Sequence, residues 1–130
     1  MAKNLVNSSI EDLESALERL GEAARLSPKK RINKDGTIQR FEFSFELSWK
    51  TIKIFLTDQG IICKSPKDCF RKAADYGLIK SPKSWFDFLK ARNNIAHTYN
   101  EKMADRIYKQ AVKFPKAARN LLNNLVKYNK

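Results

Sequence analysis

The chain has 130 residues, of which 42% are hydrophobic and 31% are charged, with only four glycines and four prolines. This length and composition predict one folded domain over residues 1–130 and exclude a disordered chain. No apolar run approaches the roughly 20 residues of a membrane span, and the first residues lack the apolar stretch of a signal peptide. We therefore expect a cytoplasmic protein with no membrane partner.

The basic excess lies almost entirely in the second part of the sequence. Residues 1–58 hold 10 basic and 9 acidic side chains, whereas residues 59–130 hold 16 basic and 5 acidic ones, out of a net charge of +12. Clustered lysine and arginine gain affinity for a polyanion by releasing counterions from its phosphates. The asymmetry favours a polyanionic partner, and the alternative is a partner protein with an acidic face.

Two long helices are predicted first. Ser8 and Ser9 are each followed three residues later by an acid, which predicts the start of an amphipathic helix that ends before Ser27-Pro28. A polar loop through Asp35-Gly36 should lead to a second helix, from about Thr37 to Gln59. The second helix is apolar on more than one side, so part of its surface is expected to face a second subunit.

The second helix also carries two acidic residues four positions apart, Glu42 and Glu46. A pair of carboxylates on one helix face is typical of general acid and base catalysis. The alternative is that they form ion pairs or a solvated stripe. We favour that second interpretation.

The cysteines give no indication of a metal site. Cys63 and Cys69 are six residues apart, lack the Cys-x-x-Cys spacing and are accompanied by one histidine in the whole chain. Structural zinc needs four such ligands. We therefore expect two free, reduced thiols, no bound metal and no cofactor.

Three more helices should complete an all-α protein. Ser65-Pro66 and Ser81-Pro82 each combine a good N-cap with proline at the first helical position, which predicts helices from Pro66 to Tyr76 and from Pro82 onward. A last helix should begin at Thr98, which Glu101 follows at capping-box spacing. Its internal Pro115 should kink it. The predicted fold is an antiparallel up-and-down bundle of four or five helices.

Basic residues near the third and fourth helices are predicted to form a diffuse electrostatic footprint for RNA. They are Lys64, Lys67, Arg71, Lys72, Lys80, Lys83 and Lys90.

The stretch with the clearest chemical meaning joins the last two helices. It reads Arg92-Asn-Asn-Ile-Ala-His97-Thr-Tyr99 and holds the only histidine of the chain. Arginine can hold a phosphate, and histidine can give or take a proton near neutral pH. A helix that ends near Ala96 would let Arg92 reach toward His97, and Asn93 could fix the orientation of the imidazole ring. The alternative is structural, with Arg92 bracing a helix end and His97 capping the turn.

Three segments give the chain a family resemblance. Gln39–Lys50, Ala73–Ile79 and the Arg92-x4-His97-x-Tyr99 signature together resemble the HEPN superfamily, and within it the HepT-like toxins and the nucleotidyltransferase substrate-binding proteins. The resemblance implies an all-helical homodimer in which the signatures of both subunits line one cleft. It also implies metal-independent RNA cleavage, with His97 as the acid and base and Arg92 holding the phosphate.

The same resemblance implies a control mechanism. Tyr99 would accept AMP from a partner minimal nucleotidyltransferase, the antitoxin of a two-component module, and the added anion would block access to His97. The alternative function is a subunit without nuclease activity that docks onto the nucleotidyltransferase. The alternative for Tyr99 is a half-buried residue at a helix start.

Overall fold

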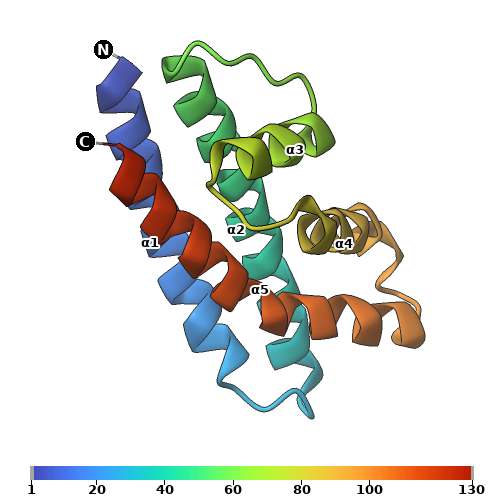
Figure 1. Cartoon of the computed structure of the whole chain (residues 1–130). Helices are drawn as coiled ribbons and strands as arrows, with labels where there is room; N and C mark the ends of the chain where they lie inside the picture. The colour runs from blue at the N-terminus through green and yellow to red at the C-terminus, as the bar shows by residue number, and fades with distance from the viewer. Residues whose placement is uncertain (1, 130) are drawn as a thin grey trace.

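The computed structural model describes residues 2–129, which are entirely helical apart from their connections. The elements are α1 (Ala2–Ala24), α2 (Arg31–Asp58), α3 (Pro66–Tyr76), α4 (Pro82–Asn93), the short 3-10 helix η1 (Ile95–His97) and α5 (Glu101–Tyr128). Figure 1 shows α1 and α2 as a long antiparallel pair, with α3 and α4 lying across α2 and α5 returning the chain toward its start. The prediction of an all-α bundle is confirmed. None of the described helices is both long and apolar enough to cross a membrane.

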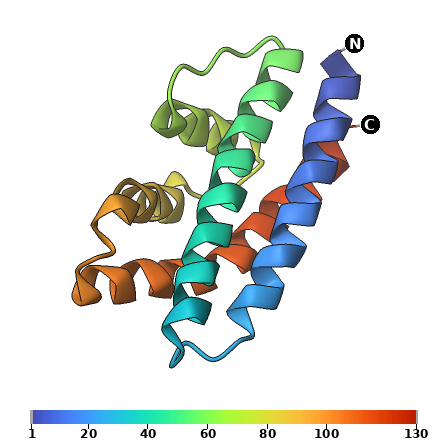
Figure 2. The same cartoon turned by 180° about the vertical axis from the view of Figure 1, so that it is seen from behind.

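Small hydroxyl residues bring α1 and α2 close together. Thr37, Ser44, Ser48 and Thr51 are all buried on α2. Each hydroxyl donates to the backbone carbonyl four residues earlier, at 2.6 to 2.9 Å, so no polar group in the contact lacks a partner. Figure 2, from behind, shows the two helices side by side along their whole length. Hydroxyl side chains of α2 thus contact α1, at Ser9 and at the carbonyls of Ala16 and Ala23. The buried rings Phe41 and Phe45 of α2 pack against Phe114 of α5.

Both long helices begin earlier than predicted. Ser9 does not cap α1: it is buried in the middle of the helix and shares a hydrogen bond with the hydroxyl of Thr51. The predicted loop through Asp35-Gly36 is also wrong, because those residues lie inside α2. Arg31, in the first turn of α2, pairs with Asp35 and with Glu101 of α5. Such contacts with the rest of the protein outweigh the local turn preference of an Asp-Gly pair.

The ends of α3 agree with the prediction. Ser65 caps α3 by accepting a hydrogen bond from the backbone N–H of Asp68 at 3.2 Å, and proline follows at the first helical position. Gly77 ends the helix in the left-handed conformation, with φ of 102°, where a side chain would be strained. Ser81 starts α4 in the same way, through the N–H of Lys83.

The core is a cluster of aromatic rings between α2, α3, α4 and α5. Phe114 of α5 is at its centre, with its ring centre 5.0 to 6.0 Å from those of four others. These four are Phe41, Phe45, Trp85 and Phe88. The next residue, Pro115, lies inside α5, and the helix changes direction near its middle (Figure 1). Proline removes a helical hydrogen bond and crowds the preceding turn, so it explains the bend.

The prediction of two free thiols is wrong. Cys63 and Cys69 are buried and form a disulfide, with their Cα atoms 4.9 Å apart. Ser65 turns the chain between them into α3, and this places the first turn of that helix against the residues before it. The sequence spacing alone does not reveal such a turn.

Candidate active site

The signature residues lie at a corner where the chain passes from α4 to α5. α4 ends at Asn93, η1 makes a single turn, and α5 begins at Glu101. The side chain of Asn100 caps α5 by accepting a hydrogen bond from the N–H of Met103 at 3.1 Å. The predicted break in the helix is therefore present, but the N-cap of α5 is Asn100, two residues after the expected cap Thr98. His97, the last residue of η1, is exposed at this corner.

Arg92 points from α4 back toward α2. Its Nε lies 2.9 Å from Oε1 of Glu46, and its guanidinium lies 5.6 Å from the ring centre of Phe45. The Nε atom is buried and its N–H is not aligned with the carboxylate, so the contact is an ion pair rather than a hydrogen bond. About a quarter of the side chain, 26%, remains exposed. Arg92 is thus attached to α2. The expected approach of Arg92 to His97 is not observed.

Glu46 is fully engaged by this arrangement. One carboxylate oxygen faces Arg92, and the other accepts a hydrogen bond from the indole N–H of Trp49 at 3.0 Å. Both oxygens of this carboxylate are therefore directed at groups of the protein itself. The ion-pair interpretation of Glu46 therefore agrees with the structure, and the paired-carboxylate interpretation with Glu42 does not.

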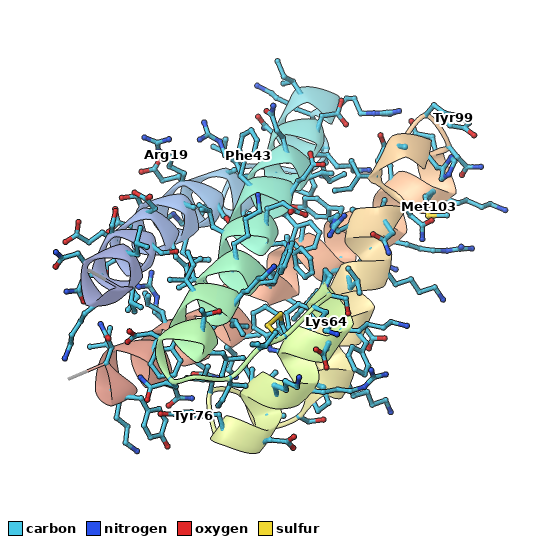
Figure 3. All side chains as sticks on the ribbon, turned by 90° about the horizontal axis from the view of Figure 1, so that it is seen from above. Arg19, Phe43, Lys64, Tyr76, Tyr99 and Met103 are labelled. Carbon is cyan, nitrogen blue, oxygen red and sulfur yellow. A yellow bond between two sulfur atoms is a disulfide. The ribbon has the colours of Figure 1, made fainter. Side chains whose placement is uncertain are left out.

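His97 contacts Tyr99 rather than Asn93. The hydroxyl of Tyr99 lies 3.5 Å from Nδ1 of His97, and the two rings meet edge to face with centres 5.9 Å apart. Tyr99 is 80% exposed, so the alternative of a half-buried ring does not hold. Figure 3 shows Tyr99 at the outer tip of the corner, with Met103 behind it. The expected contact of Asn93 with the imidazole is not formed, since that side chain is exposed and makes no hydrogen bond with residues 3–129.

Ion pairs fix the corner to the start of α2. Arg31 contacts Glu101, and Nζ of Lys34 donates to Asp105 at 2.5 Å. The hydrogen bond from Lys34 holds the pKa of Asp105 below its ordinary value, and the same bond raises the pKa of Lys34. A hollow of about 630 Å³ lies beside these pairs, between α2 and the side of the corner that carries Tyr99.

A groove leads from the corner along the seam between α4 and α5. It consists of two adjoining hollows of about 490 and 320 Å³ that share Met103 and Arg106. His97 lines the smaller hollow. The groove, called the α4–α5 groove below, has five basic side chains in its lining: Lys90, Lys102, Arg106, Lys109 and Lys113.

Of these five, only Lys90 is in the predicted RNA footprint. The other four lie on α5 at intervals of four, three and four residues, which places them on one face of a helix. That spacing was visible in the sequence and could have identified the groove.

The predicted basic residues of α3 are engaged locally. Nζ of Lys72 donates to the carbonyl of Ile62 and pairs with Asp68 at 3.3 Å. Hydrogen bonds to that carboxylate, first from the backbone N–H of Lys64 and then from Lys72, hold the pKa of Asp68 below its ordinary value.

Two further cations of α3 lie over a ring of α4. Nζ of Lys67 and Cζ of Arg71 are 5.7 and 5.3 Å from the ring centre of Phe86. Of the predicted footprint, Lys64, Lys80 and Lys83 have exposed side chains outside the groove. The structure therefore does not gather the predicted cations at the corner that holds His97.

The helical fold and the sequence of the corner between α4 and α5 are those of a known family of helical domains. The chain belongs to the family described as nucleotidyltransferase substrate binding protein like, whose model matches residues 8–127. Among curated relatives, the probable ribonuclease HepT of Haemophilus influenzae is 29% identical over an alignment of 116 residues, and the match covers 82% of this chain and 80% of that protein. The resemblance predicted from the three segments is confirmed.

Two solved structures share the fold. A protein from Thermus thermophilus matches with a TM-score of 0.82 and 31% identity, over 87% of this chain and 98% of that one. A Haemophilus influenzae protein matches with a TM-score of 0.70 and 28% identity, over 95% of this chain and 98% of that one. The latter structure is described as revealing the fold of a substrate binding domain of a nucleotidyltransferase.

Proposed function

We propose that the protein is a metal-independent endoribonuclease, the toxin of a two-component module whose other member is a minimal nucleotidyltransferase. The observation that carries the proposal is an exposed imidazole, that of His97, at the end of a groove lined by five basic side chains. The relationship to a probable ribonuclease HepT supports the same activity. The proposed substrate is RNA, since the chemistry needs a 2′-hydroxyl.

The reaction needs two proton transfers and a stabilised phosphate. The ribose 2′-oxygen loses its proton and bonds to the adjacent phosphorus, the bond to the 5′-oxygen breaks, and that oxygen takes up a proton. The products carry a 2′,3′-cyclic phosphate and a 5′-hydroxyl. His97 is proposed to move a proton. Arg92 is held by Glu46 and lines neither hollow of the groove, so its proposed role, to stabilise the charge on the phosphate with its remaining N–H groups, requires a second subunit to complete the site.

A homodimer would supply what one chain lacks. One imidazole cannot easily remove one proton and deliver another in the same step, whereas a symmetric dimer offers two. Exposed apolar side chains on α2 support a further contact surface: Ile32 is 78% exposed and Phe43 is 54% exposed. Phe43 lines a hollow with Arg19 on the outer face of α1 and α2, where Figure 3 labels both residues.

Tyr99 is proposed as the residue that the partner nucleotidyltransferase modifies. Its exposed hydroxyl would bond to the α-phosphorus of ATP as pyrophosphate leaves, and the phenol proton would be lost. The resulting AMP group would lie within reach of His97, because the unmodified hydroxyl is already 3.5 Å from that ring. A bulky anion there would exclude and repel an RNA phosphate.

A second candidate function is a subunit without nuclease activity that presents a substrate, or Tyr99 itself, to the nucleotidyltransferase. The description of the family and of the Haemophilus influenzae structure favours it. Cleavage of RNA in the presence of EDTA distinguishes the two. The purified protein should cleave RNA and the His97→Ala variant should not, whereas intact RNA at high protein concentration would favour the second function.

The modification has its own test. Incubation with the partner nucleotidyltransferase and ATP should add one or more AMP groups to the protein, measured by mass spectrometry, and Tyr99→Phe should remove the adduct. An adduct that persists in Tyr99→Phe would contradict the assignment of Tyr99.

A further inference from the structure

We propose that the α4–α5 groove binds a single RNA strand through its phosphates and leads it to His97. This proposal rests on the proposed function, which identifies the polyanion as RNA. The two hollows of the groove share Met103 and Arg106, so they form one continuous path along α5 to the corner.

The cations of the groove are arranged in a line. Lys102, Arg106, Lys109 and Lys113 lie on one face of α5, opposite the buried residues of the same helix. From first to last they span eleven residues, a distance of about 16 Å along the axis. Consecutive phosphates of a stacked strand are about 3.4 Å apart along its axis. The line is therefore long enough for several phosphates of one strand.

The positive charge of the line is only partly balanced within residues 3–129, where the charge of Lys109 helps to lower the pKa of Asp105. None of the five groove cations forms an ion pair with another described residue. Two acids at the start of α5, Glu101 and Asp105, are instead paired with Arg31 and Lys34 of α2. Asp87 is the one acidic residue in the lining of the two hollows. An incoming polyanion therefore meets cations that are not held in ion pairs with described residues.

The position of the groove favours RNA over an acidic protein as the occupant. The line of cations ends beside His97 and Tyr99, so a strand held along it would place a phosphodiester at the imidazole. The exposed ring of Tyr99 also offers a face on which a base can stack. Lysine and arginine contacts to phosphates position a strand without reading its sequence, so the groove predicts RNA binding with little sequence preference.

Binding is measured with His97→Ala protein, which keeps the RNA intact, and a fluorescent single-stranded RNA. Adding Lys109→Gln and Lys113→Gln should weaken binding about tenfold at low salt and reduce the slope of log affinity against log salt by about 1.4. The matched control replaces Lys3 and Lys53, exposed residues of α1 and α2, by glutamine, and should leave affinity and slope close to the parent. Circular dichroism checks that every variant keeps its helices.

The outcomes separate this inference from the proposed function. If the wild-type protein cleaves RNA and the groove variant binds and cleaves like wild type, the groove proposal is overturned and the nuclease stands. If no RNA is cleaved but the groove variant alone loses RNA binding, the groove proposal stands and the nuclease fails. Loss of binding to the nucleotidyltransferase with unchanged RNA binding would make the groove a protein-docking surface and overturn the proposal, as would a His97→Ala protein that binds no RNA.

Discussion

The basic residues of α3 and those of the α4–α5 groove look alike in the sequence but have different surroundings. On α3, Lys72 is bound to a carbonyl and a carboxylate, and Lys67 and Arg71 lie over the ring of Phe86. On α5, the groove cations make no ion pair with the described residues. The number of lysines therefore does not locate a binding surface; what matters is whether other groups already occupy their charge.

The largest expected effect tests whether the groove ends at a reactive group. His97→Ala should lower the rate of RNA cleavage by a factor of about 100 or more, because removal of a proton-transfer group costs at least that much. RNA affinity should change little, since the groove cations are intact. Gel-based cleavage and a binding titration on the same protein check both. Equal losses of cleavage and of affinity would mean that His97 acts in binding.

The second effect tests the α3 side of the comparison. Lys67→Gln together with Arg71→Gln should leave RNA affinity within about a factor of two while lowering the free energy of unfolding by about 1 kcal/mol, because each cation loses its contact with the ring of Phe86. Lys109→Gln with Lys113→Gln should lower RNA affinity and leave the free energy of unfolding nearly unchanged. Denaturant titration and RNA binding are measured on both pairs. A tenfold loss of RNA affinity in the α3 pair would remove the distinction between the two regions.

A third effect concerns the residue that connects α4 to α2. Glu46→Gln should lower the free energy of unfolding by about 1 kcal/mol, because the partly buried guanidinium of Arg92 would lose its counter-charge. Glu42→Gln is the matched control, because Glu42 lies on the same helix and forms no ion pair within residues 3–129. Thermal unfolding of both variants gives the measurement. Equal melting temperatures for the two would show that the Arg92–Glu46 pair adds nothing to stability.

The smallest expected effect is on stability at acid pH, to which one aspartate of α3 and one of α5 contribute. The pKa values of Asp105 and Asp68 both lie below the ordinary value of 3.8. The largest cause is a hydrogen bond in each case, from the side chain of Lys34 to Asp105 and from the backbone N–H of Lys64 to Asp68. A lowered pKa contributes stability that is present above pH 3.8 and is lost as the pH falls through the folded-state pKa. Asp105→Asn and Asp68→Asn should each slightly flatten the loss of stability below that pH. Unfolding curves between about pH 2 and 5 would show no change if these hydrogen bonds did not persist in solution.

Local signals predicted the fold where the local sequence decides the structure. Ser65 and Ser81, each followed by proline, cap α3 and α4 as expected, because a cap depends on residues within one turn. Ser9 and Asp35-Gly36 have equally good local signals for a cap and a turn, but they lie inside helices. Ser9 shares a hydrogen bond with Thr51, and the helical turn that contains Asp35 is attached to Glu101 through Arg31. Both contacts join residues more than 40 positions apart, which no local pattern encodes.

The site was predictable as a location but not as a geometry. The break between α4 and α5 and the exposure of His97 follow from the signature and from the helix signals around it. The direction of Arg92 does not, since it depends on where Glu46 of α2 falls in the folded chain. The groove cations are an intermediate case: their spacing on α5 is readable, but only the fold reveals that α4 forms the opposite wall.

The bend at Pro115 divides α5 into two parts with different surroundings. Residues before it, including Ile107, pack near α4 and carry the cations of the groove, whereas residues after it, including Leu121, belong to the body of the bundle. The bend at Pro115, outside the groove itself, therefore sets the angle between the cation-bearing part of α5 and the part packed in the bundle. If the groove binds RNA as proposed, a straighter α5 would keep every cation but change the direction of the path relative to the body of the bundle, so binding would depend on the shape of this helix as well as on its charge.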